Sequence, residues 1–218
     1  MKNIFCYGDS NTWGHNPGDF NPKTGLYGRY PENVRWPRVM ESLLGEGYRV
    51  YEEGLCGRTT TFEDPTHYGW NGITHYEVAF RTCEPIDCII IMLGTNDQKD
   101  LFNADTFNLT MALDRFFKQV YFLREFSFNP DAKVLVVNPC GIAKAADGKY
   151  CLGNSEQSAE KAIAMKEVYK NEADTLGFDF FDASAVTGPG DADGVHLSEE
   201  GHKKLAKAMA EKVKELIG

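Results

Sequence analysis

Short apolar runs alternate along this chain with longer stretches in which apolar side chains recur every three or four positions. Five runs have the length of β-strands, at residues 3–7, 48–53, 88–93, 133–138 and 178–181. Four stretches carry the helical period, at residues 36–44, 109–123, 165–176 and 205–216. The third and fourth runs are almost continuous in Ile, Val and Leu, as in strands that are covered on both faces. The pattern therefore predicts strands and helices in alternation.

Strand–helix alternation predicts a parallel sheet with helices on both sides. We expect an α/β fold, a three-layer α/β/α sandwich around a central parallel sheet of about five strands. The 218 residues contain no internal repeat or linker-like segment and fit a single domain, 1–218. Long connections occur at 14–33, 56–77 and 139–158. Because ligands of open α/β sheets bind at the carboxyl ends of the strands, functional residues are expected directly after each strand.

The composition narrows the class of protein and its partners. Hydrophobic residues make up 42% and charged residues 25%, which is typical of a soluble globular chain. The formal net charge of −9, from 23 Lys and Arg against 32 Asp and Glu, argues against nucleic acid or an anionic membrane surface as a partner. No apolar run approaches the ~20 residues that span a bilayer. We expect a small-molecule partner.

The N-terminus and the cysteines indicate the compartment. The first ten residues, MKNIFCYGDS, lack the longer apolar segment of a signal peptide. The six cysteines show neither CxxC spacing nor a zinc-like grouping, and the histidines form no H-E-x-x-H motif. We therefore expect a cytoplasmic protein with reduced thiols and without a metal or cofactor.

Candidate polar residues follow the first three predicted strands. Ser10, in Gly8-Asp9-Ser10, stands at a strand-to-helix turn, where a helix N-terminus stabilises a developing negative charge. Taken alone, the serine could equally be an N-cap, or the turn could hold a phosphate. Gly57 follows the second strand in a turn that lets the backbone approach a ligand closely. Asn96 follows the third strand and can aim its side-chain amide at the same edge of the sheet.

A histidine near the C-terminus is preceded by a carboxylate that can orient it. Asp193 stands three residues before His196, so that its carboxylate can accept the Nδ1–H bond and leave Nε2 free as a base. Each signal is weak alone, and Asp-x-x-His could also be half of a metal site. Together they supply a hydroxyl nucleophile, a general base and oxyanion donors, which acyl transfer requires.

These segments resemble the four blocks of the SGNH/GDSL hydrolases, in the order typical of that family. The blocks are Gly8-Asp9-Ser10, Gly57, Gly94-x-Asn96 and Asp193-x-x-His196. Their surroundings, such as Arg58-Thr59-Thr60, are similar to the small arylesterase/acyltransferase subgroup. The resemblance spans nearly the whole chain and implies the flavodoxin-like SGNH hydrolase fold.

The resemblance also implies roles for individual residues. Ser10 would be the nucleophile, His196 the general base and later the general acid, and Asp193 the residue that orients His196. The oxyanion hole would comprise the backbone N–H groups of Ser10 and Gly57 and the side-chain amide of Asn96. Asp9 and Asp97 would brace the loops. Two departures from the family pattern are Asn11, which replaces a Leu and should affect packing behind the nucleophile, and the Gly54-Leu55-Cys56-Gly57 form of the second block.

The expected function is that of a serine esterase or acylhydrolase that cleaves short-chain acetyl-type or aryl esters through an acyl-serine intermediate. Acyl transfer to an alcohol and O-deacetylation of a carbohydrate stay open on the same fold. A non-catalytic flavodoxin-like binding module, with residues 8–12 holding a phosphate, is the rival from another class. Trp13, His15 and Trp70 are candidate pocket residues that would suit a sugar, an aryl ester or a subunit contact. The subgroup also implies a homo-oligomer.

Overall fold

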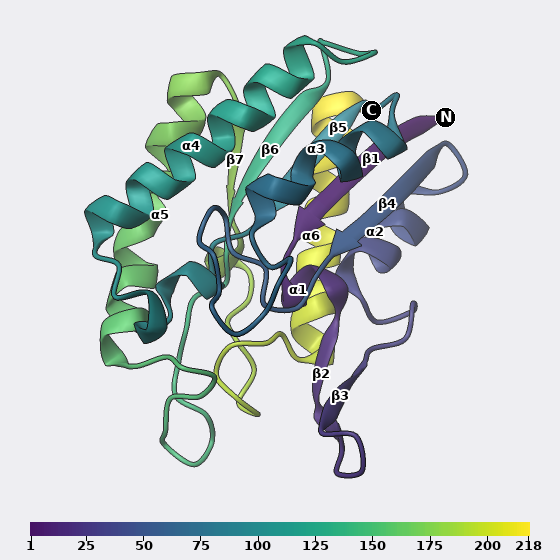
Figure 1. Ribbon diagram of the computed structural model, residues 1–218. Helices are drawn as coiled ribbons and strands as arrows, with labels where there is room; N and C mark the ends of the chain where they lie inside the picture. The colour runs from purple at the N-terminus through teal and green to yellow at the C-terminus, as the bar shows by residue number, and fades with distance from the viewer.

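The computed structural model describes residues 1–218, and its centre is one sheet of five parallel strands (Figure 1). The strands are β1 (Lys2–Gly8), β4 (Tyr48–Gly54), β5 (Cys88–Met92), β6 (Lys133–Asn138) and β7 (Asp179–Asp182). Their order across the sheet is β4-β1-β5-β6-β7. All five predicted strands are present within a residue or two of their predicted limits. No helix of the protein is both long enough and apolar enough to cross a membrane.

Helices cover both faces of the sheet and confirm the predicted three layers. On one face lie α2 (Trp36–Leu44) and α6 (Glu199–Ile217), and on the other lie α3 (Gly72–Cys83), α4 (Thr106–Glu125) and α5 (Glu156–Leu176). Successive strand residues point to opposite faces, so Ile90 packs in the α2–α6 core while Ile89 and Ile91 pack in the other. Helices cover both faces, which explains why the apolar runs of β5 and β6 are continuous rather than alternating.

Two predicted connections contain regular structure. Within 14–33, strands β2 (His15–Asn21) and β3 (Leu26–Arg29) form an antiparallel hairpin that projects from the sheet beyond its carboxyl end (Figure 1). Within 56–77, the chain already enters α3. The helical spacing of Ile73, Tyr76 and Phe80 was available as a signal for α3, whereas the hairpin strands are largely exposed and carry no buried alternation.

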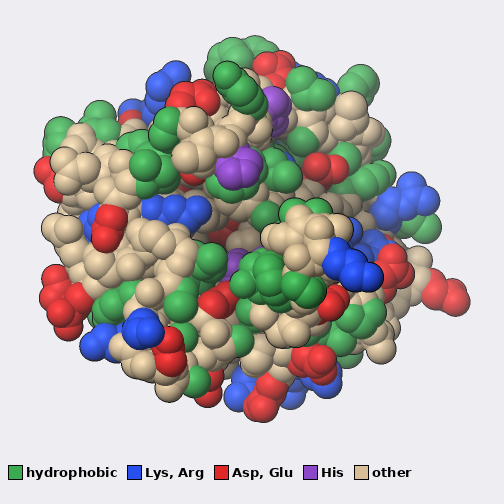
Figure 2. Space-filling model, turned by 60° about the horizontal axis from the view of Figure 1, so that its bottom comes forward, with side chains coloured by type: hydrophobic (Ala, Val, Ile, Leu, Met, Phe, Trp, Pro, Cys, Tyr) green, Lys and Arg blue, Asp and Glu red, His purple; other side chains and the backbone are tan.

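The strand order places the carboxyl ends of β4, β1 and β5 side by side at one edge of the sheet. The chain runs from β1 outward to β4 and then returns across β1 to β5, so the direction of winding changes beside β1. Crevices at such switch points are the usual ligand sites of open α/β sheets. The short helices α1 (Ser10–Trp13), η1 (Asn96–Gln98) and η2 (Asp100–Phe102) start at this edge, and η3 (Ala183–Ala185) follows the carboxyl end of β7. Figure 2 looks onto this end of the molecule and shows a hollow with a histidine side chain in it and another on the surface beside it.

His202 makes stability depend on pH. It is fully buried on α6, and its Nδ1 accepts a hydrogen bond from the backbone N–H of Trp36, 3.3 Å away. Burial, with the charges of His196 and Arg35, lowers the pKa of His202 from 6.5 to about 4. As the pH falls below 6.5, the unfolded chain takes up this proton before the folded protein does, so the free energy of unfolding falls between pH 6.5 and 4.

We expect the melting temperature to be lower at pH 5 than at pH 7.5, because about 2 kcal/mol of stability is lost through His202 over that range. Scanning calorimetry of His202→Gln should give a smaller difference between the two pH values. His75→Gln, at an exposed histidine, is the control and should behave as wild type. An equal pH effect in wild type and His202→Gln would contradict the assignment.

Candidate active site

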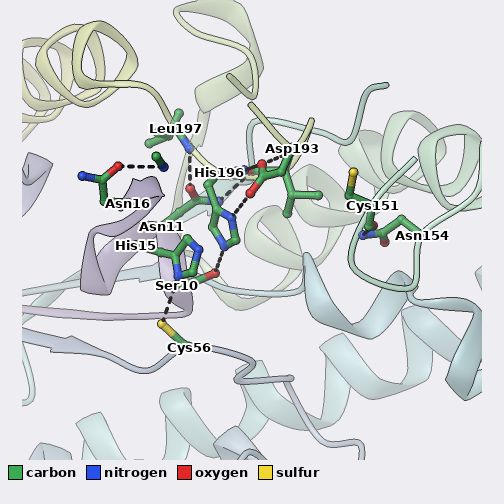
Figure 3. Close-up of polar contacts among 12 residues, drawn as sticks. Ser10, Asn11, His15, Asn16, Cys56, Cys151, Asn154, Asp193, His196 and Leu197 are labelled. Carbon is green, nitrogen blue, oxygen red and sulfur yellow. Dashed lines mark hydrogen bonds and ion pairs between the residues drawn. The ribbon is translucent and has the colours of Figure 1, made fainter. Parts of the chain in front are cut away.

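Ser10, His196 and Asp193 form a continuous chain of hydrogen bonds (Figure 3). Ser10 is the first residue of α1, directly after β1, and Asp9 caps this helix by accepting the Asn11 N–H. The Ser10 hydroxyl lies 2.9 Å from His196 Nε2, and His196 Nδ1 lies 2.5 Å from Asp193 Oδ2. All three side chains are largely buried. In this geometry the imidazole can accept the hydroxyl proton while the carboxylate holds the ring in the required tautomer.

Asp193 is held as a carboxylate. Its Oδ1 accepts the backbone N–H groups of Val195 and His196, both at 2.9 Å, and its Oδ2 faces the His196 ring. Burial alone would raise the pKa of Asp193. The hydrogen bond and charge of His196 and the two backbone N–H groups outweigh burial and lower this pKa to about 2. The group is therefore ionised throughout the neutral range and can stabilise an imidazolium.

Asn11 links the turn that carries Ser10 to the segment that carries His196. Its Oδ1 accepts the Leu197 N–H at 2.9 Å, and its Nδ2 donates to the Val195 carbonyl at 3.3 Å (Figure 3). These two groups flank His196 on either side. Sequence reasoning assigned Asn11 an effect on packing behind the nucleophile, whereas the structure shows a buried polar link between two segments of the site.

Asn11→Leu is expected to lower both stability and activity. The Leu197 N–H and the Val195 carbonyl would lose their partners in a buried place, at a cost of about 2 kcal/mol. A small displacement of His196 should lower kcat/KM by roughly ten- to a hundredfold. Thermal unfolding and ester hydrolysis measured on the same preparation test this. A variant as stable and active as wild type would show that the link is dispensable.

Gly57 and Asn96 lie at the same cavity as Ser10. Gly57 has φ +80°, and a Cβ atom there would lie 2.5 Å from the Trp70 ring, so only glycine fits. Asn96 begins η1, and its Nδ2 donates to the Arg58 carbonyl at 3.1 Å, which fixes the amide plane. The N–H of Ser10 is in the first turn of α1, where backbone donors have no helical acceptor. These groups are suited to donate hydrogen bonds to an oxyanion formed beside Ser10.

Asn96→Ala is expected to reduce kcat by roughly 10²–10³-fold with little effect on folding, because it removes one oxyanion donor. Steady-state kinetics on an aryl acetate measure this effect. Asn129→Ala is a matched control, since Asn129 also donates its amide to a backbone carbonyl, that of Ile86, at the opposite end of the sheet. An unchanged kcat in Asn96→Ala would remove Asn96 from the site.

Asp97 joins the loop after β5 to the loop after β4. Its carboxylate accepts the Thr60 N–H at 2.9 Å and also the Thr60 hydroxyl. Burial raises the pKa of Asp97 to about 6, despite these hydrogen bonds. Asp97 is not among the residues that line the cavity beside Ser10. Its contacts fit the bracing role that sequence reasoning gave it.

His15 stacks on His196. The two ring centroids are 3.9 Å apart with an angle of 26° between the planes, and His15 Nδ1 lies 4.0 Å from Cys56 Sγ (Figure 3). Burial, with the charge of His196, lowers the pKa of His15 to about 4, so the ring is neutral at pH 7. Possible ligand atoms of His15, Asp193 and His196 lie within 4.8 Å of one another. However, His196 already uses both ring nitrogens in hydrogen bonds, so a metal ion there would break the Ser10–His196–Asp193 chain.

The cavity beside Ser10 has a volume of about 190 Å³ and includes two of the three predicted pocket residues, His15 and Trp70. Trp13 is not among its lining residues. Instead, the Trp13 ring faces the Arg29 guanidinium at 5.1 Å, and its carbonyl accepts from Arg29 Nε. Sequence reasoning missed six lining residues: Cys56, Thr95, Lys99, Leu152, Asn154 and Val195. Four of them directly precede or follow a motif residue or lie within three positions of one, which was the available signal.

Solved structures similar to this one share both its fold and its length. The native aryl esterase of M. smegmatis is 33% identical, covers 100% of both chains and superposes with a TM-score of 0.90. Est24, a carbohydrate acetylesterase from Sinorhizobium meliloti, is also 33% identical over 100% of both chains, with a TM-score of 0.88. A carbohydrate acetylesterase family member from the same organism is 28% identical over 100% of both chains, with a TM-score of 0.85. No curated protein gives a significant match to the sequence.

The fold, the family model and the solved esterase structures place this chain among the hydrolases of esterase or acylhydrolase type with a three-layer α/β/α architecture. The model of the GDSL-like lipase/acylhydrolase family matches residues 6–204, and the chain belongs to this family. The resemblance seen in the four sequence blocks is thereby confirmed.

Proposed function

We propose that this protein is a serine esterase that cleaves short-chain acyl esters with Ser10, His196 and Asp193 as its catalytic triad. The observation that carries the proposal is the unbroken hydrogen-bond chain from the Ser10 hydroxyl through His196 to the Asp193 carboxylate. The cavity of about 190 Å³ beside it suits an acetyl-sized acyl group.

In the proposed reaction, Ser10 Oγ attacks the ester carbonyl while His196 Nε2 takes the hydroxyl proton. The carbonyl oxygen becomes an oxyanion that accepts hydrogen bonds from the N–H groups of Ser10 and Gly57 and from the Asn96 amide. When the tetrahedral intermediate collapses, His196 gives its proton to the leaving alcohol, and an acyl-serine remains. Water, or another alcohol, then attacks the acyl-serine with His196 again acting as the base.

Intact-mass spectrometry after exposure to a fluorophosphonate tests the proposed nucleophile. One adduct per chain that peptide mapping places at Ser10 is the expected result, and His196→Ala should slow its formation greatly. Absence of an adduct on folded protein would refute an activated serine. The flavodoxin-like binding module would then be tested by looking for a flavin or nucleotide in the absorption spectrum of the purified protein.

Deacetylation of a carbohydrate is the second candidate, favoured by the likeness to the S. meliloti carbohydrate acetylesterases. Trp70 lines the cavity, and the His67 ring stacks on it with centroids 3.8 Å apart, so an aromatic side chain held in place is available to contact a sugar or an aryl ring. Turnover of an acetylated xylo-oligosaccharide compared with p-nitrophenyl acetate separates the two substrates. If the protein hydrolysed only p-nitrophenyl acetate, carbohydrate deacetylation would be excluded and the cleavage of small esters would stand.

A further inference from the structure

Lys99 places one unpaired positive charge in the wall of the active-site cavity. Of the twelve residues that line this cavity, Lys99 is the only lysine or arginine, and no aspartate or glutamate lines it. The remaining wall is apolar or uncharged, apart from the two stacked histidines. A negative charge on a bound substrate would therefore find its one fixed counter-charge inside the cavity in Lys99.

The position of Lys99 is fixed relative to the oxyanion donors. Its backbone N–H donates to the Asn96 carbonyl at 3.3 Å, which sets Lys99 one turn after Asn96. Its Nζ lies 5.5 Å from the centroid of the Trp70 ring, and this ring packs against Gly57. Lys99 thus lies in the same short segment as Asn96, and its side chain contacts the ring that packs against Gly57.

Lys99 has no partner that satisfies its charge. No ion pair in the structure includes it, and its ammonium group makes no hydrogen bond to another residue. The contact with the Trp70 ring is near the distance limit for a cation–π interaction. The side chain is half-buried, and burial lowers the pKa of Lys99, although the charges of Asp64, Asp9 and Asp97 act against burial. An anionic group of a substrate would form a charge-assisted hydrogen bond with the Lys99 ammonium and would stabilise its charged form, which burial disfavours.

We propose that Lys99 selects acetyl-type esters whose alcohol part carries a carboxylate. This inference rests on the proposed esterase function and adds a substrate class to it. The charge is assigned to the alcohol part because the proposed acyl group is a neutral acetyl group, and a cavity of about 190 Å³ can hold this group together with part of the alcohol. The net charge of −9 gives no general attraction for anions, so selection depends on this one cation.

Matched pairs of aryl acetates test the proposal. The anionic probes are the acetyl esters of 3- and 4-hydroxyphenylacetate, and the neutral probes are those of the corresponding hydroxyphenylacetamides. A methylene group separates the charge from the ring, and each rate is divided by the rate of hydroxide-catalysed hydrolysis to remove differences in intrinsic reactivity. We expect kcat/KM of wild type to favour the anionic member of at least one pair by about tenfold.

Variants of Lys99 test whether its positive charge causes the preference for the anionic ester. In Lys99→Met the anionic-to-neutral ratio should fall to about one, in Lys99→Arg most of it should remain, and in Lys99→Glu it should fall below one. Lys144→Met is the matched control, because Lys144 also faces an aromatic ring, Tyr150 at 5.4 Å, but does not line the cavity. The wild-type ratio should also decrease as salt concentration rises.

Each contrary result overturns a defined part of the proposal. Equal hydrolysis of both members of every pair by wild type would overturn the substrate class and leave the esterase function intact. A preference that survives in Lys99→Met would remove Lys99 from selection, and an equal slowing of both esters in that variant would assign Lys99 to the oxyanion instead. Failure of wild type to hydrolyse any of the four esters would overturn the proposed function together with this inference.

Discussion

Ser10→Ala is expected to lower kcat for an aryl acetate by roughly 10⁵–10⁶-fold, the scale seen when a triad nucleophile is removed. Ser10 Oγ is the only hydroxyl that hydrogen-bonds to His196, whose other ring nitrogen faces Asp193. The change removes one oxygen atom from a largely buried side chain and leaves the backbone of α1 intact, so the fold should persist.

The measurement is single-turnover release of the phenol together with the mass of the protein after fluorophosphonate treatment. Ser42→Ala serves as the control, since Ser42 is exposed on α2, away from the cavity, and should keep full activity and labelling. Residual activity within tenfold of wild type, in a preparation free of wild-type protein, would mean that the acyl group passes to a different group.

The fold was predictable because its central strands β1, β5 and β6 are buried on both faces. Side chains of β5 and β6 fill two cores at once, which leaves an uninterrupted apolar run that no surface strand would show. The β2–β3 hairpin was not predictable in the same way. Phe20, Leu26 and Tyr27 of the hairpin are exposed, so no pattern of burial marks its strands in the sequence.

The core of the site was predictable because short motifs fall at the ends of predicted strands. Asp193 and His196 are three residues apart and form a local unit, which a sequence reveals directly. Lys99 lies three residues after Asn96, but this spacing alone does not predict that it lines the cavity, because its place there depends on how η1 turns after β5. The contribution of Asn11 was also hidden, since its partners Val195 and Leu197 are 184 and 186 residues away in the chain.

Asp193→Asn is expected to reduce kcat/KM by about 10⁴-fold while the protein stays folded. The asparagine Oδ1 can still accept the backbone N–H groups of Val195 and His196, so the loop should keep its shape. Its Nδ2 would then face His196 Nδ1 as a donor. The ring would have to carry its proton on Nε2, where it points at the Ser10 hydroxyl and cannot accept a proton from it.

Two explanations for a slow Asp193→Asn variant can be distinguished: the wrong tautomer of His196, and the loss of one negative charge near the site. If Asp193 acts by setting the tautomer, Asp193→Asn should melt within a few degrees of wild type, and its rate of fluorophosphonate labelling should fall in parallel with kcat/KM. Asp191→Asn, two residues earlier on the exposed part of the same loop, removes an equal charge and should leave both rates unchanged. If kcat/KM and the labelling rate fell equally in Asp193→Asn and Asp191→Asn, the effect would come from the negative charge of the loop as a whole. His196 would then not depend on Asp193 for its orientation.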